Sequence, residues 1–296
     1  MGESSIPLNL LNPGQVFACI GFTEAAQHLI GRAEAAFDWS DEAQCRFALR
    51  ASGAADPFEE VLRFLATAEV VGQAPPGSGL TALWISGWGK VESLPLGSPY
   101  PYPEPSSPAT LRAVLRAGGR ELAVEHWGDG TRRDATKFWA GARGYPGAAL
   151  ARDALALVRD RCVGAARDPF ALAAPQSSSF RLDWRRDYIP IDTGFSLNKH
   201  GSRIQTVGFP LVELLGAVGL GHARPQRPDP RNKLEYRYGV VGRGNGVEWY
   251  PPAILRAALG CSSLAFPSRR FRMILGWPGK EGQARSITTV TEETTE

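Results

Sequence analysis

An apolar segment close to the start of the chain constrains the fold most. Residues 16–30 are mostly apolar, and they directly follow the sequence Asn-Pro-Gly-Gln at 12–15. Asn12 is of a type favoured at helix N-caps, and the proline after it fits the first helical position because its missing N–H would have no partner there. Gln15 stands three residues after Asn12, as in a capping box. The pattern therefore predicts a capped helix over about 13–29.

Hydrophobic periodicity and turn residues predict the other elements of the chain. Strands are expected over 6–10, 45–51, 80–89, 180–188 and 269–277, hairpins over 111–127 and 234–250, helices over 57–71, 148–164, 209–220 and 251–259, and loops over 72–79 and 95–108. Strands and helices mix without a regular βαβ repeat. The predicted class is therefore α+β, with mixed, mainly antiparallel strands and packed helices.

The length of 296 residues allows one large domain or two smaller ones. A linker-like segment at 167–179 suggests a boundary. We therefore predict an N-terminal α+β region over 1–170, a basic C-terminal α+β region over 171–285, and a polar tail over 286–296.

Composition argues against several classes of protein. No uninterrupted apolar run reaches the length of a membrane-spanning helix, and the N-terminus lacks the basic residues of a secretory signal, so we expect a cytoplasmic protein without a membrane partner. The four cysteines lie far apart and form no Cys-x-x-Cys pair, which favours reduced core cysteines. The four histidines also lack ligand spacing, so neither a metal site nor a cofactor is expected.

No motif in the sequence predicts a catalytic residue. The chain contains no Gly-x-Ser-x-Gly, no phosphate-binding loop of the Walker type and no dinucleotide fingerprint. Asp183 and Asp187 are separated by Trp-Arg-Arg, and the two arginines favour ion pairs over a shared metal. A metal-dependent nuclease that uses Asp183, Asp187 or Asp192 is therefore the least favoured hypothesis.

Positive charge is concentrated in the C-terminal part of the chain. Residues 181–272 carry 15 Lys and Arg against 7 Asp and Glu, whereas the rest of the chain carries 18 against 23. Such asymmetry points to an anionic partner.

Several basic residues of this part stand close to aromatic residues in the sequence. Guanidinium groups pair with phosphates, and aromatic rings such as those of Trp184, Tyr236 and Tyr238 can stack on bases. The candidate nucleic-acid contacts are Arg185, Arg186, Lys199, Arg203, Arg231, Lys233, Arg237, Arg243, Arg269 and Arg270, with a second group of Arg132, Arg133, Lys137 and Arg143. The alternatives are a solvated positive sheet face, or arginines that pair with acidic residues of another protein.

Three stretches together resemble a known family. They are 12–26 (NPGQVFACIGFTEAA), 137–155 (KFWAGARGYPGAALARDAL) and the pairing of 182–201 (LDWRRDYIPIDTGFSLNKHG) with 210–225 (PLVELLGAVGLGHARP). In their order and spacing they resemble the small Cas8-like accessory proteins of type I-G (formerly I-U) CRISPR-Cas systems. The resemblance spans about 6–277.

The resemblance implies a non-catalytic subunit or accessory factor of a crRNA-guided effector complex that works in antiviral defence. Its partners would be other type I-G Cas subunits and crRNA or target DNA. The resemblance brings no catalytic residue with it. The resemblance also suggests a second role for the start of the first helix, because the N–H groups of a helix N-terminus with a glycine can bind a phosphate. Asn12, Gly14 and Gln15 are the candidates for that contact.

A protein–protein adaptor is the rival hypothesis. Such an adaptor would dock on the large effector subunit without touching nucleic acid. An exposed apolar patch, formed by the 95–108 loop and the 209–220 helix, would distinguish it from a nucleic-acid-binding subunit.

Overall fold

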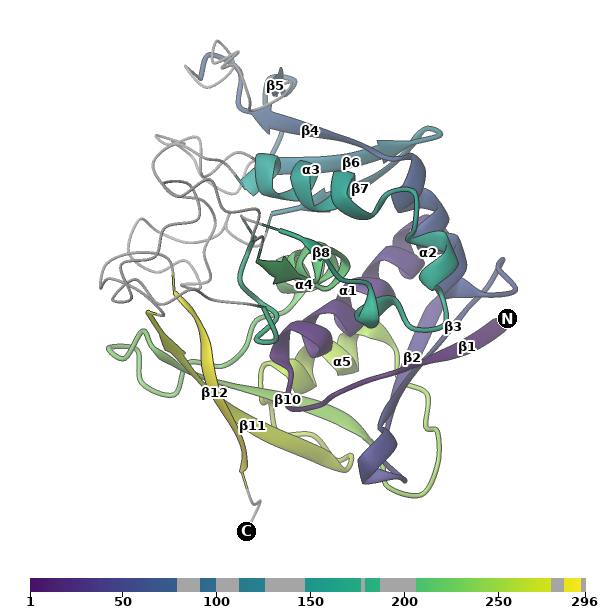
Figure 1. Cartoon of the computed structure of the whole chain (residues 1–296), viewed down its shortest axis with the longest axis vertical. Coiled ribbons are helices and arrows are strands. Elements are labelled where there is room, and N and C mark those ends of the chain that lie inside the picture. The colour runs from purple at the N-terminus through teal and green to yellow at the C-terminus, as the bar shows by residue number, and fades with distance from the viewer. Residues whose placement is uncertain are drawn as a thin grey trace.

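Figure 1 shows the computed structural model of the chain, an α+β fold with mixed, mainly antiparallel sheets. The structure describes residues 1–78, 91–99, 112–125, 147–176, 179–186, 206–277 and 285–293. Within these ranges it contains five α-helices and twelve strands. No helix within them is both long and apolar enough to cross a membrane.

The larger sheet has six strands in the order β1-β3-β2-β10-β11-β12. These are β1 (Gly2–Pro7), β2 (Ala33–Asp38), β3 (Arg46–Ala51), β10 (Glu235–Arg243), β11 (Ser268–Gly276) and β12 (Ser286–Glu293). Strands β2 and β10 pair in parallel at the centre, and the other neighbours are antiparallel. The sheet thus joins strands from both ends of the chain.

A second sheet has the order β5-β4-β6-β7, and a small third sheet pairs β8 with β9. Their bounds are β4 (Glu69–Ala74), β5 (Val91–Ser93), β6 (Arg112–Ala117), β7 (Arg120–Val124), β8 (Ala174–Pro175) and β9 (Val207–Gly208). Gly118 and Gly119 connect β6 to β7, both with positive φ, which suits a tight hairpin turn.

The helices lie mainly between the two larger sheets (Figure 1). They are α1 (Pro13–Leu29), α2 (Pro57–Thr67), α3 (Gly147–Val158), α4 (Pro210–His222) and α5 (Pro252–Leu259), with short 3-10 helices η1 (Glu42–Gln44), η3 (Val163–Ala165) and η4 (Pro169–Ala171). α1 packs along α4, against β2 and β3 on one side and β7 on the other. Both helices are buried almost all round, as their apolar sequences require.

Glycine allows α1 and α4 to approach closely. A β-carbon at Gly21 would lie 2.0 Å from the carbonyl oxygen of Leu215, and one at Gly219 would lie 2.1 Å from that of Phe17. The two backbones are therefore in contact at this crossing, and a larger residue would force them apart.

Several predicted elements are confirmed. The helix predicted over 13–29 is α1, the hairpin turning at Gly118 and Gly119 is β6-β7, and the helices predicted over 209–220 and 251–259 are α4 and α5. The strands predicted over 45–51 and 269–277 are β3 and β11. The predicted strand over 80–89 lies outside the described residues.

Other predicted elements are wrong. The helix predicted over 57–71 ends at Thr67, because the Glu-Val-Val segment that follows belongs to strand β4. Strand β4 extends to Ala74, so the loop predicted over 72–79 begins later than expected. The strand predicted over 180–188 is absent from 179–186, which has no regular secondary structure apart from a turn at 184–185 and a bend at Arg186. The first predicted strand lies earlier, over Gly2–Pro7, and strand β2 was not predicted.

The hairpin predicted over 234–250 does not form. Strand β10 continues to Arg243 and pairs with β2 and β11 instead of with the residues that follow it. Gly242 explains this pairing, because a β-carbon there would lie 2.1 Å from the carbonyl oxygen of Phe37 on β2. The glycine thus serves close strand pairing.

The segment predicted as a polar tail contains an ordered strand. Strand β12 covers Ser286–Glu293 and pairs with β11, and Ser286 and Ile287 are buried. The division into regions 1–170 and 171–285 stays a prediction.

Candidate functional site

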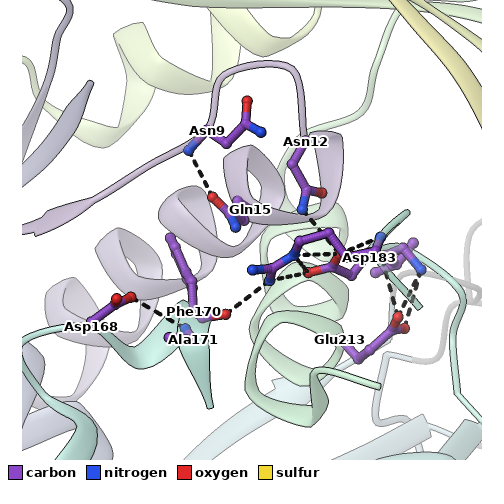
Figure 2. A network of polar contacts seen from close by, with 10 residues as sticks. Asn9, Asn12, Gln15, Asp168, Phe170, Ala171, Asp183 and Glu213 are labelled. Carbon is purple, nitrogen blue, oxygen red and sulfur yellow. Dashed lines mark hydrogen bonds and ion pairs between the residues drawn. The ribbon is translucent and has the colours of Figure 1, made fainter. Parts of the chain in front are cut away.

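The start of α1 belongs to an internal polar network (Figure 2). The side chain of Asn12 makes no capping bond, although Asn12 is the N-cap residue. Its Nδ2 instead donates to Oδ1 of Asp183 at 3.0 Å, and both residues are fully buried. The predicted capping role of the Asn12 side chain is therefore wrong.

Gln15 and Gly14 also have internal roles. Oε1 of Gln15 accepts from the backbone N–H of Asn9 at 2.8 Å, so the predicted capping box does not form. A β-carbon at Gly14 would lie 2.6 Å from the carbonyl oxygen of Leu182. The backbone of 182–183 therefore covers the place where a phosphate would approach the helix N-terminus.

Asp183 is the central acceptor of the network. It accepts from the backbone N–H of Arg185 at 2.9 Å and from Nη2 of the same residue at 2.6 Å. Nη2 of Arg185 also donates to the carbonyl oxygen of Phe170 at 2.8 Å, and its guanidinium lies 3.6 Å from the ring centroid of Phe209. Arg185 is thus held mainly by the protein itself, and the ion pair expected between Asp183 and a flanking arginine is confirmed.

Glu213 on α4 fixes the same segment from the other side. Its carboxylate accepts from the backbone N–H groups of Leu182 and Asp183 at 3.1–3.2 Å. Burial raises the pKa of Glu213 to about 7, although these N–H groups and the charge of Arg186 act in the opposite direction. Arg186 is itself buried and donates to Oγ of Ser179 at 2.5 Å, so it is not a surface contact.

The arginines on the strands of the larger sheet mostly pair with glutamates. Nε of Arg237 lies 2.7 Å from Glu293, Nε of Arg243 lies 2.6 Å from Glu248, and Nη2 of Arg269 lies 2.5 Å from Glu292. Arg272, which neighbours Arg237 across the strands, pairs with Glu235 at 2.7 Å. These arginines therefore pair with glutamates of the same chain, whereas the predicted alternative of acidic partners on another protein stays a prediction.

The side chains of β10 and β11 separate into two faces. Arg237 lies opposite Arg272, and Gly239 lies opposite Arg270, so the three arginines share one face, which α5 covers in part because the backbone of its Ala258 lies against Gly239. The tyrosines flanking Arg237 on β10 are buried, as is Phe271. We call the face that carries Arg237, Arg270 and Arg272 the arginine face.

Most of the aromatic side chains that were candidates for base stacking are buried in the core. Tyr238 stacks on Phe271 with ring centroids 5.1 Å apart, and its hydroxyl donates to the carbonyl oxygen of Leu10 at 2.7 Å. The prediction that tyrosines of β10 stack on bases is therefore wrong. Trp184 is 39% exposed, and Trp249 lies under the guanidinium of Arg50 at 4.6 Å.

A basic loop precedes β10. Arg231 is exposed, and the loop also carries Lys233 and two further arginines. Across 224–237, 268–277 and 285–293, nine basic residues stand against four acidic ones. The loop and the arginine face thus keep a net positive charge in spite of the ion pairs.

The remaining candidate residues lie outside the described residues. They are Arg132, Arg133, Lys137, Arg143, Lys199 and Arg203, together with Asp187 and Asp192 of the nuclease hypothesis. Within the described residues, no group of three His, Cys, Asp or Glu side chains could hold a metal ion. Asp183, the one described aspartate of that hypothesis, is committed to Asn12 and Arg185.

A pocket that was not predicted from the sequence lies beside the polar network. It has a volume of about 300 Å³ and is lined by Asn9, Gln15, Arg46, Asp168 and Arg185, among others. Asp168 caps the short helix η4, accepting from the N–H of Ala171 at 3.2 Å. The pair Asp-Pro at 168–169 is a helix-start signal that could have located one wall. The other walls come from distant parts of the chain.

A second pocket of about 500 Å³ lies next to the first and shares Leu8, Asn9, Ala43 and Cys45 with it. Its charged residues are Glu42, Arg269 and Glu292, and the arginine pairs with both glutamates. Its own ion pairs thus satisfy the charges of this second pocket.

Comparisons with protein-family models, with curated proteins and with solved structures found no match to this chain.

Proposed function

We propose that this chain is a non-catalytic, nucleic-acid-binding subunit or accessory factor of a crRNA-guided type I-G CRISPR effector complex in the cytoplasm. The observation that carries the binding proposal is the arginine face, together with the basic loop at 224–233 beside it. The assignment to an effector complex rests on the sequence resemblance.

The arrangement of this surface supports contact with phosphates. Arg237, Arg270 and Arg272 stand on neighbouring strands of one rigid sheet, so their charges lie close together. Two of the three pair with glutamates at the surface, and exposed ion pairs of this kind contribute little and exchange easily for a phosphate. Binding would therefore be driven by phosphates and not by base stacking.

The adaptor alternative loses one of its two supporting features. Helix α4, which was expected to contribute to an exposed apolar patch, is buried from Pro210 to Leu220. Leu96 in the 95–108 loop is 93% exposed and keeps that part of the hypothesis open to test.

Binding of the purified chain to single-stranded RNA and to duplex DNA tests the proposal. Affinity should fall steeply between 50 and 200 mM salt, because each phosphate contact releases counterions, with a slope in log–log form of about −0.7 per contact for a single strand. Affinity that does not change with salt, or no binding to either nucleic acid, would contradict the proposal and favour the adaptor.

A triple variant locates the contact. Arg237→Gln, Arg270→Gln and Arg272→Gln together should weaken binding and reduce the salt slope for RNA by about 2, the value expected for three lost phosphate contacts. The matched control removes the same charge from exposed arginines elsewhere, at Arg32, Arg63 and Arg167. Equal losses in both variants would show that only net charge matters and would reject the arginine face.

Co-purification tests the assignment to a complex. The tagged chain would be expressed with its operon neighbours and a CRISPR array, and the eluate analysed for protein subunits and crRNA. Elution of the chain alone and free of RNA would contradict this assignment.

A further inference from the structure

The pocket lined by Gln15, Asp168 and Arg185 carries polar groups that the polar network does not use. Gln15 forms part of its floor, because this residue is only 5% exposed and also lines the pocket. Since Oε1 of Gln15 accepts from the backbone N–H of Asn9, the free end of its amide is the Nε2 donor. Among the described residues, Nε2 has no hydrogen-bond partner. This donor is not among the fully buried polar atoms, so it is open to the pocket, and an acceptor atom of a ligand would take the place of water there.

Arg185 supplies a second donor to the same pocket. Its Nε and Nη2 are committed to Asp183 and to the carbonyl oxygen of Phe170, whereas Nη1 has no partner among the described residues. Because the committed nitrogens fix the plane of the guanidinium, Nη1 is held in place before any ligand arrives. The pocket therefore offers two preorganised donors.

Asp168 supplies the acceptor. Only its Oδ1 is used in the cap of η4, so Oδ2 is available at the exposed rim of the pocket. Figure 2 shows Asp168 at the start of η4 and Gln15 in the first turn of α1, the two elements that carry these groups. Leu8 and Pro7 add apolar walls, and Arg46 adds a further cation.

We propose that this pocket binds a guanine base. The O6 atom would accept from Nε2 of Gln15 and Nη1 of Arg185, and the N1–H and N2–H groups would donate to the carboxylate of Asp168. Arg46 would face the phosphate of the nucleotide. A volume of about 300 Å³ is at the lower end for small-ligand sites and suits one nucleoside.

The order of polar groups favours guanine over the other bases. Guanine presents one acceptor beside two donors on its pairing edge, which matches two donors beside a carboxylate. Adenine, cytosine and uracil each present a single donor group beside acceptors on that edge. None of them can therefore donate two hydrogen bonds from adjacent groups to the carboxylate of Asp168. The same base could come from a free nucleotide or from a nucleic-acid strand, and only the second source rests on the proposed function.

Calorimetric titration of the full chain with GMP, IMP, AMP, CMP and UMP tests the proposal. GMP should bind at least tenfold more tightly than AMP, CMP or UMP. IMP, which lacks only the N2 amino group, should lose about tenfold relative to GMP, the usual value of one hydrogen bond to a charged group. Equal affinity for all five nucleotides, or binding of none of them and of no guanine-containing strand, would overturn it.

A conservative variant assigns the binding to the pocket. Asp168→Asn keeps an oxygen that can cap η4 but replaces the free carboxylate oxygen by an amide, and it should weaken GMP binding at least tenfold. Asp160→Asn, at an exposed site eight residues earlier in the sequence that does not line the pocket, is the matched control and should leave binding unchanged. If Asp168→Asn binds GMP like the wild type, the pocket is not the site.

Short single strands distinguish the two sources and separate this proposal from the proposed function. An oligouridine with one guanine that binds more tightly than GMP, with loss of the preference in Asp168→Asn, would identify a strand-borne base. Binding of GMP without any strand binding would support the pocket and reject the proposed function. Salt-dependent strand binding without base preference, unchanged in Asp168→Asn, would reject the pocket alone.

Discussion

At the residue scale, Asn12 shows how one side chain can look like a local cap and serve a distant contact. Asn12 precedes Pro13 at the start of α1, but its amide donates to Asp183 instead of accepting from its own helix. Asp56, which precedes Pro57 at the start of α2, does cap, accepting from the N–H groups of Phe58 and Glu59. The two positions read alike in the sequence and differ in their chemistry.

Exchanging Asn and Asp at positions 12 and 56 distinguishes a buried contact from a helix cap. Asn12→Asp would place a second carboxylate against Asp183 in a fully buried site and should lower the free energy of unfolding by about 3–5 kcal/mol. A true cap tolerates either residue, so Asp56→Asn should cost less than about 1 kcal/mol. Urea unfolding of both variants at pH 7 measures this. A small effect of Asn12→Asp would restore the capping interpretation.

Glu213 should make stability depend on pH. Its pKa is raised from 4.5 to about 7 by burial, so the folded state holds a proton that the unfolded state releases between these values. The contribution of Glu213 to the free energy of unfolding is therefore largest below pH 4.5. It decreases by roughly 3 kcal/mol in total as the pH rises to about 7. The variant Glu213→Gln should lack this slope. Parallel unfolding curves of both proteins at pH 5 and 8 test it, and an equal pH dependence would contradict the assignment.

At the element scale, the two most buried helices depend on glycine for their packing. Gly21 on α1 and Gly219 on α4 meet the backbone of the opposite helix, so neither has room for a side chain. This crossing brings the start of α1 towards Leu182 and Glu213, and thereby positions the polar network beside the pocket.

Alanine at this crossing should be costly. Gly219→Ala would place a β-carbon 2.1 Å from the carbonyl oxygen of Phe17, and we expect a loss of about 1–3 kcal/mol or more in unfolding free energy. Gly164→Ala is the control, since no atom lies within 4 Å of the place that its β-carbon would take and no positive φ is required. It should be neutral or slightly stabilising. Equal melting temperatures for the two variants would show that the helices can separate freely.

At the scale of the whole molecule, one apolar core reaches across the larger sheet and the helices above it. It includes Phe17 on α1, Phe47 on β3 and Tyr238 on β10. All four cysteines lie in buried positions and are free thiols. Burial raises the pKa of each of these thiols, so the reactive thiolate is scarce at neutral pH.

Thiol reactivity therefore reports on global unfolding. The native chain should react slowly with a disulfide reagent such as Ellman's reagent, and all four thiols should react in guanidinium chloride without reductant. Fewer than four thiols after unfolding would reveal a disulfide, and rapid reaction in the native state would contradict the buried positions.

The sequence by itself determined the elements whose signals act within a few residues. The start of α1 was correctly predicted from Pro13, and α2, α4 and α5 likewise begin with a proline, because its fixed φ and missing N–H suit the first turn of a helix. Gly118 and Gly119 likewise located the β6-β7 turn through their positive φ. Segregation of arginine from the buried tyrosines on β10 follows from alternation along a strand.

Only the tertiary structure decided which groups meet. Asn12 and Asp183 are 171 residues apart in the sequence, and the arginines of β10 and β11 find their glutamates across neighbouring strands. The pocket combines Gln15 with Asp168 and Arg185 in the same way. A side chain's local pattern states what it can donate or accept, whereas packing of the helices and sheets selects the partner, because the free energy of burying the core greatly exceeds that of any one polar contact.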